Sequence, residues 1–238
     1  MENKFNFIII GAGVIGLSIA ERLSRRTDNI LVIDKEKKFG QHTSSRNSEV
    51  VHSGFYYPNK SLKAQLCVKG NKMIYDFCDK YNIPYNKCGK LVIANTKYEL
   101  DQLDKISVLA KSNGVNNIKI LSSQQSQEIE PMVKCVKSLW VPSTGIVDSH
   151  LLMSKLENLS ISRDVSFLYN LEVNSISSVA NGYQLDFKND ADTVVADNII
   201  NCAGLWSHKI ANKIVNNKYN IKYYKGDYFK APGLKGLK

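Results

Sequence analysis

Residues 5–34 of the chain read FNFIIIGAGVIGLSIAERLSRRTDNILVID. Phe5–Ile10 is an apolar, β-branched run that is typical of a buried parallel strand. Val14–Arg25 carries apolar residues at helical spacing, and Ile30–Ile33 is a second apolar run that ends at Asp34. Because a strand, a helix and a strand follow one another within about 30 residues, the sequence predicts a βαβ unit and an α/β fold.

Three glycines between the first predicted strand and the helix follow the spacing G-x-G-x-x-G, at Gly11, Gly13 and Gly16. Gly11 permits a tight turn, Gly13 lets the backbone approach a pyrophosphate, and Gly16 allows close helix–strand packing. Asp34, at the end of the second strand, can accept hydrogen bonds from a ribose, which disfavours NADP. The motif therefore predicts a dinucleotide site and leaves both NAD and FAD open.

The segment Gln41–Ser48 is rich in hydroxyl, amide and cationic side chains and follows the second strand. FAD is long and needs donors along its whole path, so this segment favours FAD over NAD. An ordinary solvated loop is the alternative. His42 lies beside the expected phosphate path, where it has a structural or a cofactor-facing role.

Composition excludes several classes of protein. The 238 residues are 43% hydrophobic and 23% charged, as in globular proteins, and the net charge is +10. The lysines are scattered without a block of like charge, so we expect no nucleic-acid partner. Five cysteines without a C-x-x-C pair predict reduced thiols, no metal site and a cytoplasmic protein. Phe7–Ala20 is too short for a membrane span, and no targeting segment is recognised.

The rest of the chain alternates helical and strand patterns. The predicted helices are Ser61–Tyr81, Leu100–Ala110, Ser123–Ile129, His150–Leu159 and Leu205–Ile214. The predicted strands are Lys90–Ala94, Ile118–Leu121, Ser138–Val141, Val165–Tyr169, Leu171–Ile176, Tyr183–Phe187, Asp197–Cys202 and Ile221–Lys230, with a hairpin turn at Asn181-Gly182. We expect a Rossmann-like dinucleotide-binding domain (residues 1–85 and 145–215) interleaved with a second α+β, sheet-containing substrate domain (residues 86–144 and 216–238).

Four further blocks carry a family resemblance: Arg46–Pro58 (RNSEVVHSGFYYP) with Ser61–Ala64, Cys88–Ala94 (CGKLVIA), Pro142–Asp148 (PSTGIVD) and Asn201–Ser207 (NCAGLWS). Together they closely resemble L-2-hydroxyglutarate dehydrogenases, which are FAD enzymes of the D-amino-acid-oxidase-like group. The resemblance implies oxidation of L-2-hydroxyglutarate to 2-oxoglutarate, with electrons passed to an acceptor such as a membrane quinone. The alternatives are a related oxidase of another hydroxy acid or amino acid, or an inactive flavin-binding fragment or subunit.

The resemblance also implies which residues hold FAD. The expected set is Gly11, Ala12, Gly13, Val14, Ile15, Gly16, Asp34, Lys35, Thr43, Ser44, Ser45, Asn47, Ser48, Val173, Ala203 and Gly204. Within this set, Thr43, Ser44 and Ser45 lie along the pyrophosphate and ring. Val173 gives a backbone contact near the adenine, and Ala203-Gly204 returns under the cofactor.

Oxidation of a hydroxy acid needs a base for the hydroxyl proton, and histidine titrates in the useful range. His52 lies in the family-like segment and is the candidate base, with a purely structural histidine as the alternative. The substrate has two carboxylates, for which Arg46, Tyr56 and Lys63 are candidate ligands and Lys90 is a further point charge. Solvated surface residues are the alternative for each of them.

Relatives in this family continue well beyond the point where this chain ends. They return to the nucleotide-binding domain with another glycine-rich segment, which the sequence after Tyr228 does not resemble. We therefore expect a C-terminally truncated, N-terminal portion of the enzyme, impaired in activity, with a second chain as one source of the rest. The expected location is cytoplasmic, peripheral at the inner membrane.

Overall fold

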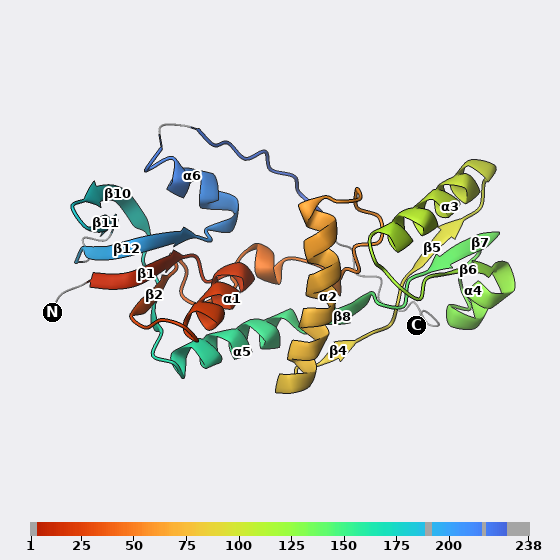
Figure 1. Ribbon diagram of the computed structural model, residues 1–238, viewed down its shortest axis with the longest axis horizontal. Helices are drawn as coiled ribbons and strands as arrows, with labels where there is room; N and C mark the ends of the chain where they lie inside the picture. Colours follow the sequence, from red (N-terminus) through yellow and green to blue (C-terminus); the bar gives the residue numbers. More distant parts are fainter. Residues whose placement is uncertain (1–3, 189–191, 216–217, 228–238) are drawn as a thin grey trace. The chain divides into compact units, whose positions relative to one another are not determined.

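The computed structural model describes residues 4–188, 192–215 and 218–227 (Figure 1). The chain forms two compact units. The first consists of the described residues within Met1–Asn47 and Ser149–Gly226, and the second consists of Ser48–Asp148 with Asp227. The first boundary therefore lies earlier than the sequence predicts, because residues 48–85 pack with the second unit. Residues 218–226, expected in the substrate domain, lie with the first unit, where Asn212 Nδ2 donates to the carbonyl of Tyr219 (2.8 Å).

The first unit is built on one mixed sheet in the order β10-β11-β12-β1-β2-β9. Its strands are β1 (Lys4–Ile10), β2 (Ile30–Ile33), β9 (Ser166–Leu168), β10 (Val173–Val179), β11 (Gly182–Phe187) and β12 (Val194–Asn201). β1 pairs in parallel with both β2 and β12, and β9 pairs in parallel with β2. The βαβ prediction is confirmed, since α1 (Val14–Leu23) connects β1 to β2.

Helices and a hairpin complete the first unit. α1 packs against α5 (Ser149–Ile161), and short 3₁₀ turns cover Thr43–Ser45 (η1) and Gly204–Trp206 (η2), the latter followed by α6 (Ser207–Ala211). The hairpin between β10 and β11 is confirmed, but its turn lies one residue earlier than predicted, because Val179 pairs with Gly182 and leaves Ala180 and Asn181 as the turn. Gly182, the first residue of β11, has a φ of +121°, and a Cβ on it would lie 2.2 Å from the carbonyl oxygen of Ala196, so only glycine fits there.

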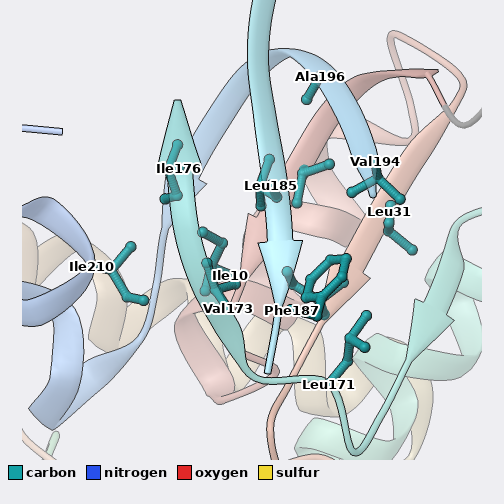
Figure 2. Packing of buried hydrophobic residues seen from close by; sticks show 12 residues of the cluster. Ile10, Leu31, Leu171, Val173, Ile176, Leu185, Phe187, Val194, Ala196 and Ile210 are labelled. Carbon is teal, nitrogen blue, oxygen red and sulfur yellow. The ribbon is translucent and has the colours of Figure 1, made fainter. Parts of the chain in front are cut away.

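The core of the first unit gathers apolar side chains from β1, β2, β10, β11, β12 and α6 (Figure 2). Ile8, Ile10, Leu31 and Ile33 contribute alternate residues of the two central strands to this cluster. The intervening residues Ile9 and Val32 are also buried. Because both faces of β1 and β2 are covered, these strands read as continuous apolar runs in the sequence.

The second unit is α+β, with two small antiparallel sheets. β3 (Val50–Val51), β8 (Gly145–Val147) and β4 (Tyr85–Asn86) form one sheet, and β5 (Leu91–Ala94), β7 (Lys137–Trp140) and β6 (Lys119–Ser122) form the other. Its helices are α2 (Leu62–Tyr81), α3 (Lys97–Ser112) and α4 (Ser123–Ile129). Residues from β5, β7 and α3, including Ala94, Leu103 and Leu139, form its apolar core.

Two parts of the secondary-structure prediction are wrong. The helix predicted over Leu205–Ile214 is broken into η2 and the shorter α6. The strand predicted over Ile221–Lys230 is absent from residues 221–227, and residues 228–230 lie outside the described part of the chain. An alternating pattern makes a strand only where a neighbouring strand accepts its hydrogen bonds, and no described strand pairs with residues 221–227.

Candidate functional site

The turn between β1 and α1 is closed by backbone contacts that leave no room for side chains at two glycines. Gly11 has a φ of +110°, and a Cβ on it would lie 2.4 Å from the carbonyl oxygen of Cys202. A Cβ on Gly16 would lie 1.9 Å from the carbonyl oxygen of Gly11. These two glycines are therefore required by the turn itself.

Gly13 is required less by the fold. Its backbone is extended at the N-cap of α1, and the nearest atom to an added Cβ is Ser44 Oγ, at 3.0 Å. The residue is half-buried, and Ile15, two residues further along the chain, is 64% exposed although it is apolar. The N-terminus of α1 is thus accessible, and its free N–H groups and dipole favour an anion. This arrangement fits the pyrophosphate of a dinucleotide.

Two side chains from distant parts of the sequence hold this turn in shape. Asp34 Oδ2 accepts the N–H of Ala12 at 2.7 Å, and its Oδ1 accepts the N–H of Glu36 at 2.9 Å. Ser44 Oγ accepts the N–H of Val14 at 3.0 Å and so acts as a remote cap for α1. The sequence suggests ligand contacts for Asp34 and Ser44, but it gives no sign that they also brace the glycine turn.

The polar loop after β2 folds back on the glycine turn. The N–H of Gly40 donates to the carbonyl of Ala12 at 3.0 Å, and the Ser45 hydroxyl donates to the carbonyl of Gly40. Asn47 Nδ2 donates to the carbonyls of Thr43 and Ser44, which stabilises η1. Internal hydrogen bonds therefore order the loop, while Thr43 and residues 45–48 are exposed to solvent.

The segment after β12 lies against the segment after β2. Lys35 Nζ lies 3.4 Å from the centroid of the Trp206 ring, and the His42 ring centroid lies 4.5 Å from it. The His42 imidazole is hydrogen-bonded to Glu36, with Nε2 and Oε1 2.7 Å apart. Trp206 is a contact that the sequence did not single out.

The expected cofactor residues of the first unit gather at the carboxyl ends of parallel strands. Gly11 follows β1, Asp34 and Lys35 follow β2, and Ala203 and Gly204 follow β12. This edge is where open α/β sheets bind their ligands. Val173 is buried in the core cluster on β10, so only its backbone is available to a ligand. Ser48 is exposed and belongs to the second unit.

In the second unit, His52 is held by its backbone. Its carbonyl oxygen accepts Asn71 Nδ2 at 3.2 Å and the Cys67 thiol at 3.4 Å, both from α2. Asn71 Nδ2 also donates to the carbonyl of Ser143 at 2.8 Å. Among the described residues, the His52 imidazole has no hydrogen-bond partner, whereas the His42 imidazole is bonded to Glu36.

Charge and burial around His52 keep its ring neutral. Burial, and then the positive charges of Lys90 and Lys63, lower the pKa of His52 below its ordinary value of 6.5. Lys63 Nζ lies 4.2 Å from the centroid of the Tyr57 ring, and the hydroxyls of Tyr56 and Tyr57 are 3.4 Å apart. The hydrogen bond to Tyr57, together with burial, raises the pKa of Tyr56. A neutral imidazole near neutral pH can accept a proton.

The structure brings together some of the expected substrate residues and not others. His52, Tyr56 and Lys63 belong to the second unit, whereas Arg46 belongs to the first. A hollow of about 380 Å³ in the second unit is lined by residues of β4 and β8 with their neighbours, and by none of the expected substrate residues. The candidate site in this unit is therefore the exposed surface around His52.

No group of three or more His, Cys, Asp or Glu side chains in the described ranges 4–188, 192–215 and 218–227 could hold a metal ion. No helix in them is both long and apolar enough to cross a membrane. The five cysteines, Cys67, Cys78, Cys88, Cys135 and Cys202, are all free thiols.

Relatives named L-2-hydroxyglutarate dehydrogenase match much of the chain. It is 43% identical over 155 residues to the mitochondrial L-2-hydroxyglutarate dehydrogenase of Arabidopsis thaliana, which covers 65% of this chain and 32% of the relative. It is 36% identical over 214 residues to the mitochondrial L-2-hydroxyglutarate dehydrogenase of Caenorhabditis briggsae, covering 87% of this chain and 49% of the relative. The chain thus spans about half, or less, of these relatives' length.

A solved structure and a family profile agree with these relatives. The dithionite-reduced L-α-glycerophosphate oxidase of Mycoplasma pneumoniae, which has FAD bound, superimposes with a TM-score of 0.82 at 26% identity, covering 90% of this chain and 57% of the other. The profile of FAD-dependent oxidoreductases of the DAO family matches residues 6–237, nearly the whole sequence. This protein is therefore a member of the DAO family of FAD-dependent oxidoreductases.

Proposed function

We propose that this chain carries the FAD-binding and proton-accepting parts of an enzyme that oxidises L-2-hydroxyglutarate to 2-oxoglutarate. The substrate is inferred from the names of the relatives at 36–43% identity. The chemistry is supported by one observation above others: His52 is fixed through its backbone carbonyl, while its imidazole has no hydrogen-bond partner among the described residues. A purely structural histidine is usually bonded through its ring, as His42 is.

In this proposal, different groups of residues bind different parts of FAD. Gly11, Gly13 and Gly16, with Ala12, Val14 and Ile15, receive the pyrophosphate at the N-terminus of α1. Asp34 and Lys35 face the adenosine end, with the backbone of Val173 near the adenine. Thr43, Ser44, Ser45, Asn47 and Ser48 supply donors toward the ring, and Ala203-Gly204 lies beneath it.

The reaction needs two functions besides cofactor binding. When bound, FAD accepts the hydride that leaves carbon 2 of the substrate. An imidazole nitrogen of His52 takes the proton of the 2-hydroxyl, and its lowered pKa keeps it unprotonated and ready near neutral pH. Arg46, Tyr56 and Lys63 are proposed to bind the substrate carboxylates, because a guanidinium, a phenol and an ammonium can all donate to carboxylate oxygens.

The first experiment follows the visible absorbance of the purified chain. The protein is incubated with FAD, freed of unbound flavin, and mixed with L-2-hydroxyglutarate without oxygen. We expect a bound flavin whose absorbance bleaches, and slower bleaching but equal flavin content in His52→Ala. His150→Ala is the matched control, since His150 is exposed in α5 and is not among the expected site residues. Bleaching at the wild-type rate in His52→Ala would exclude His52 as the base.

The same assay separates the alternatives. Bleaching by an amino acid with release of ammonia would favour an amino-acid oxidase, and a bound flavin that no hydroxy acid bleaches would favour a flavin-binding subunit. Whole-enzyme activity, in this proposal, depends on the part of the relatives' length that these 238 residues do not span. Co-expression with a second chain that supplies this part should then raise the flavin content.

The electron acceptor is proposed to be a membrane quinone, reached by peripheral attachment of a cytoplasmic enzyme at the inner membrane. The net charge of +10 supports attraction to an anionic lipid surface. Co-sedimentation with vesicles of anionic phospholipid should therefore exceed that with neutral vesicles and should fall with added salt. Equal sedimentation with both kinds of vesicle would remove the support for peripheral attachment.

A further inference from the structure

One ridge of α2 holds the loop that contains His52. Lys63, Cys67, Asn71 and Tyr75 recur every four residues and so share one face of the helix. Cys67 and Asn71 donate to the carbonyl of His52, and the Tyr75 hydroxyl donates to the carbonyl of Ser143 at 3.1 Å. Lys63, at the first turn of the helix, reaches the Tyr57 ring. Its ammonium group is thus directed to the same loop.

Lys90 lies close to this loop through the residue that precedes it. The N–H of Gly89 donates to the carbonyl of Thr144 at 2.9 Å, and the Thr144 hydroxyl donates to Ser53 Oγ at 3.2 Å. Gly89, which precedes Lys90, is therefore linked through Thr144 to Ser53, the residue that follows His52. Its own backbone is fixed by paired hydrogen bonds with Val141, at 3.1 and 2.9 Å.

Neither of these lysines is neutralised by an acid. Elsewhere in the chain lysines pair with carboxylates, as Lys4 does with Asp197 (3.1 Å) and Lys188 does with Glu172 (2.6 Å). In the part of the chain that the structure describes, no carboxylate lies within ion-pairing distance of Lys63 or Lys90. Both positive charges act on the His52 ring and disfavour a proton there, so an anionic ligand beside the ring would be attracted by both lysines.

We propose that Lys63 and Lys90, with the Tyr56 hydroxyl, form a carboxylate-binding subsite beside His52. The inference rests on the proposed function for the identity of the ligand, a 2-hydroxy or 2-oxo dicarboxylate. Two ammonium groups provide donors to both oxygens of one carboxylate, and the Tyr56 hydroxyl adds a third donor when its proton turns from Tyr57 Oη to the ligand. A carboxylate bound there leaves the neighbouring carbon 2 of the same molecule next to the imidazole. Lys90 is thus assigned to substrate positioning, together with Lys63.

The test measures binding of 2-oxoglutarate to the 238-residue chain by titration calorimetry, without turnover. We expect Lys63→Met and Lys90→Met each to weaken binding about tenfold, which is about 1.4 kcal/mol, and Lys→Arg at either position to restore most of it. Lys72→Met is the control on α2. It lies nine residues from Lys63, and at about 3.6 residues per turn this is the opposite face. Lys97→Met is an exposed control in α3.

Failure of this inference and failure of the proposed function give different results. Unchanged affinity in both lysine variants, with circular dichroism equal to wild type, would overturn the subsite even if L-2-hydroxyglutarate still bleaches the flavin. Weakened binding confined to Lys63→Met and Lys90→Met would support the subsite even if no bleaching occurs. Equal loss in Lys72→Met and Lys97→Met would also overturn it, because attraction would then be a matter of net charge.

Discussion

Replacing Gly13 with alanine separates the demands of the fold from those of the ligand. The added Cβ would lie 3.0 Å from Ser44 Oγ, a side-chain atom that can move, so the fold should survive. The N-cap preference of glycine over alanine and the Val14–Ser44 hydrogen bond, which the added methyl group would disturb, together are worth about 1–2 kcal/mol. The methyl group stands where a pyrophosphate would approach the helix N-terminus. Loss of one hydrogen bond to a charged phosphate costs about 1.5–3 kcal/mol, or about ten- to a hundredfold in the dissociation constant of FAD.

The matched control is Gly16→Ala, which should lose FAD binding because the fold itself is disrupted. Its Cβ would lie 1.9 Å from the backbone oxygen of Gly11, far inside the ordinary contact distance of about 3.5–4.0 Å. The strand and helix would have to separate, so soluble, folded protein should be lost. The assay pairs urea unfolding with fluorescence titration of FAD. A folded Gly13→Ala variant that binds FAD as tightly as wild type would refute the assignment of this turn to the pyrophosphate.

Three further predictions concern other parts of the chain. Glu21 is buried (5% exposed), accepts a hydrogen bond from Arg25 Nε at 2.9 Å and lies 3.3 Å from Arg163 Nη1. Glu21→Gln should therefore lower the free energy of unfolding by about 1–2 kcal/mol in urea denaturation. Glu128→Gln is the exposed control. Lys90→Met should raise the pKa of His52 toward 6.5 in an NMR titration, because the protonated ring would lose a repulsive neighbour; an unchanged midpoint would contradict the electrostatic picture. The pKa of His52 is lower in the folded chain than in the unfolded chain, so the unfolded chain takes up the proton first as the pH falls. The contribution of His52 to stability is therefore present above about pH 6.5 and is lost as the pH falls below that value. This loss of stability should be smaller in His52→Gln.

The sequence predicts the βαβ part of the first unit well because its signals are local. A buried strand, a glycine turn, an amphipathic helix and a second buried strand each leave a pattern within one short window. The second unit is harder to predict, because β3, β4 and β8 are two or three residues long and are defined by pairing partners far along the chain. Those pairings carry residues 48–85 into the second unit. No sequence pattern within α2 predicts these pairings.

The candidate site shows the same limit at the level of single side chains. Asp34 and Ser44 follow from the dinucleotide motif and the polar loop, but their bonds to Ala12 and Val14 join residues 22 and 30 positions apart. Such contacts depend on how the loop returns over the turn, which the sequence pattern does not specify. Trp206 was missed for the same reason, since its partners Lys35 and His42 come from another strand end.

The spacing of the residues on the α2 ridge can be read from the sequence, but the contacts that these residues make cannot. Lys63, Cys67, Asn71 and Tyr75 place four polar or polarisable groups at four-residue intervals, on a helix that otherwise only needs an apolar face to pack. The contacts of Cys67 and Asn71 go to a carbonyl, so they fix the backbone of His52 and leave its ring available. A base needs this combination, because its ring must stay in one position and still exchange protons with a substrate. Polar residues at regular spacing along a packed helix therefore indicate that the helix positions another segment. Which segment it positions becomes clear only when the structure shows the loop that these residues hold.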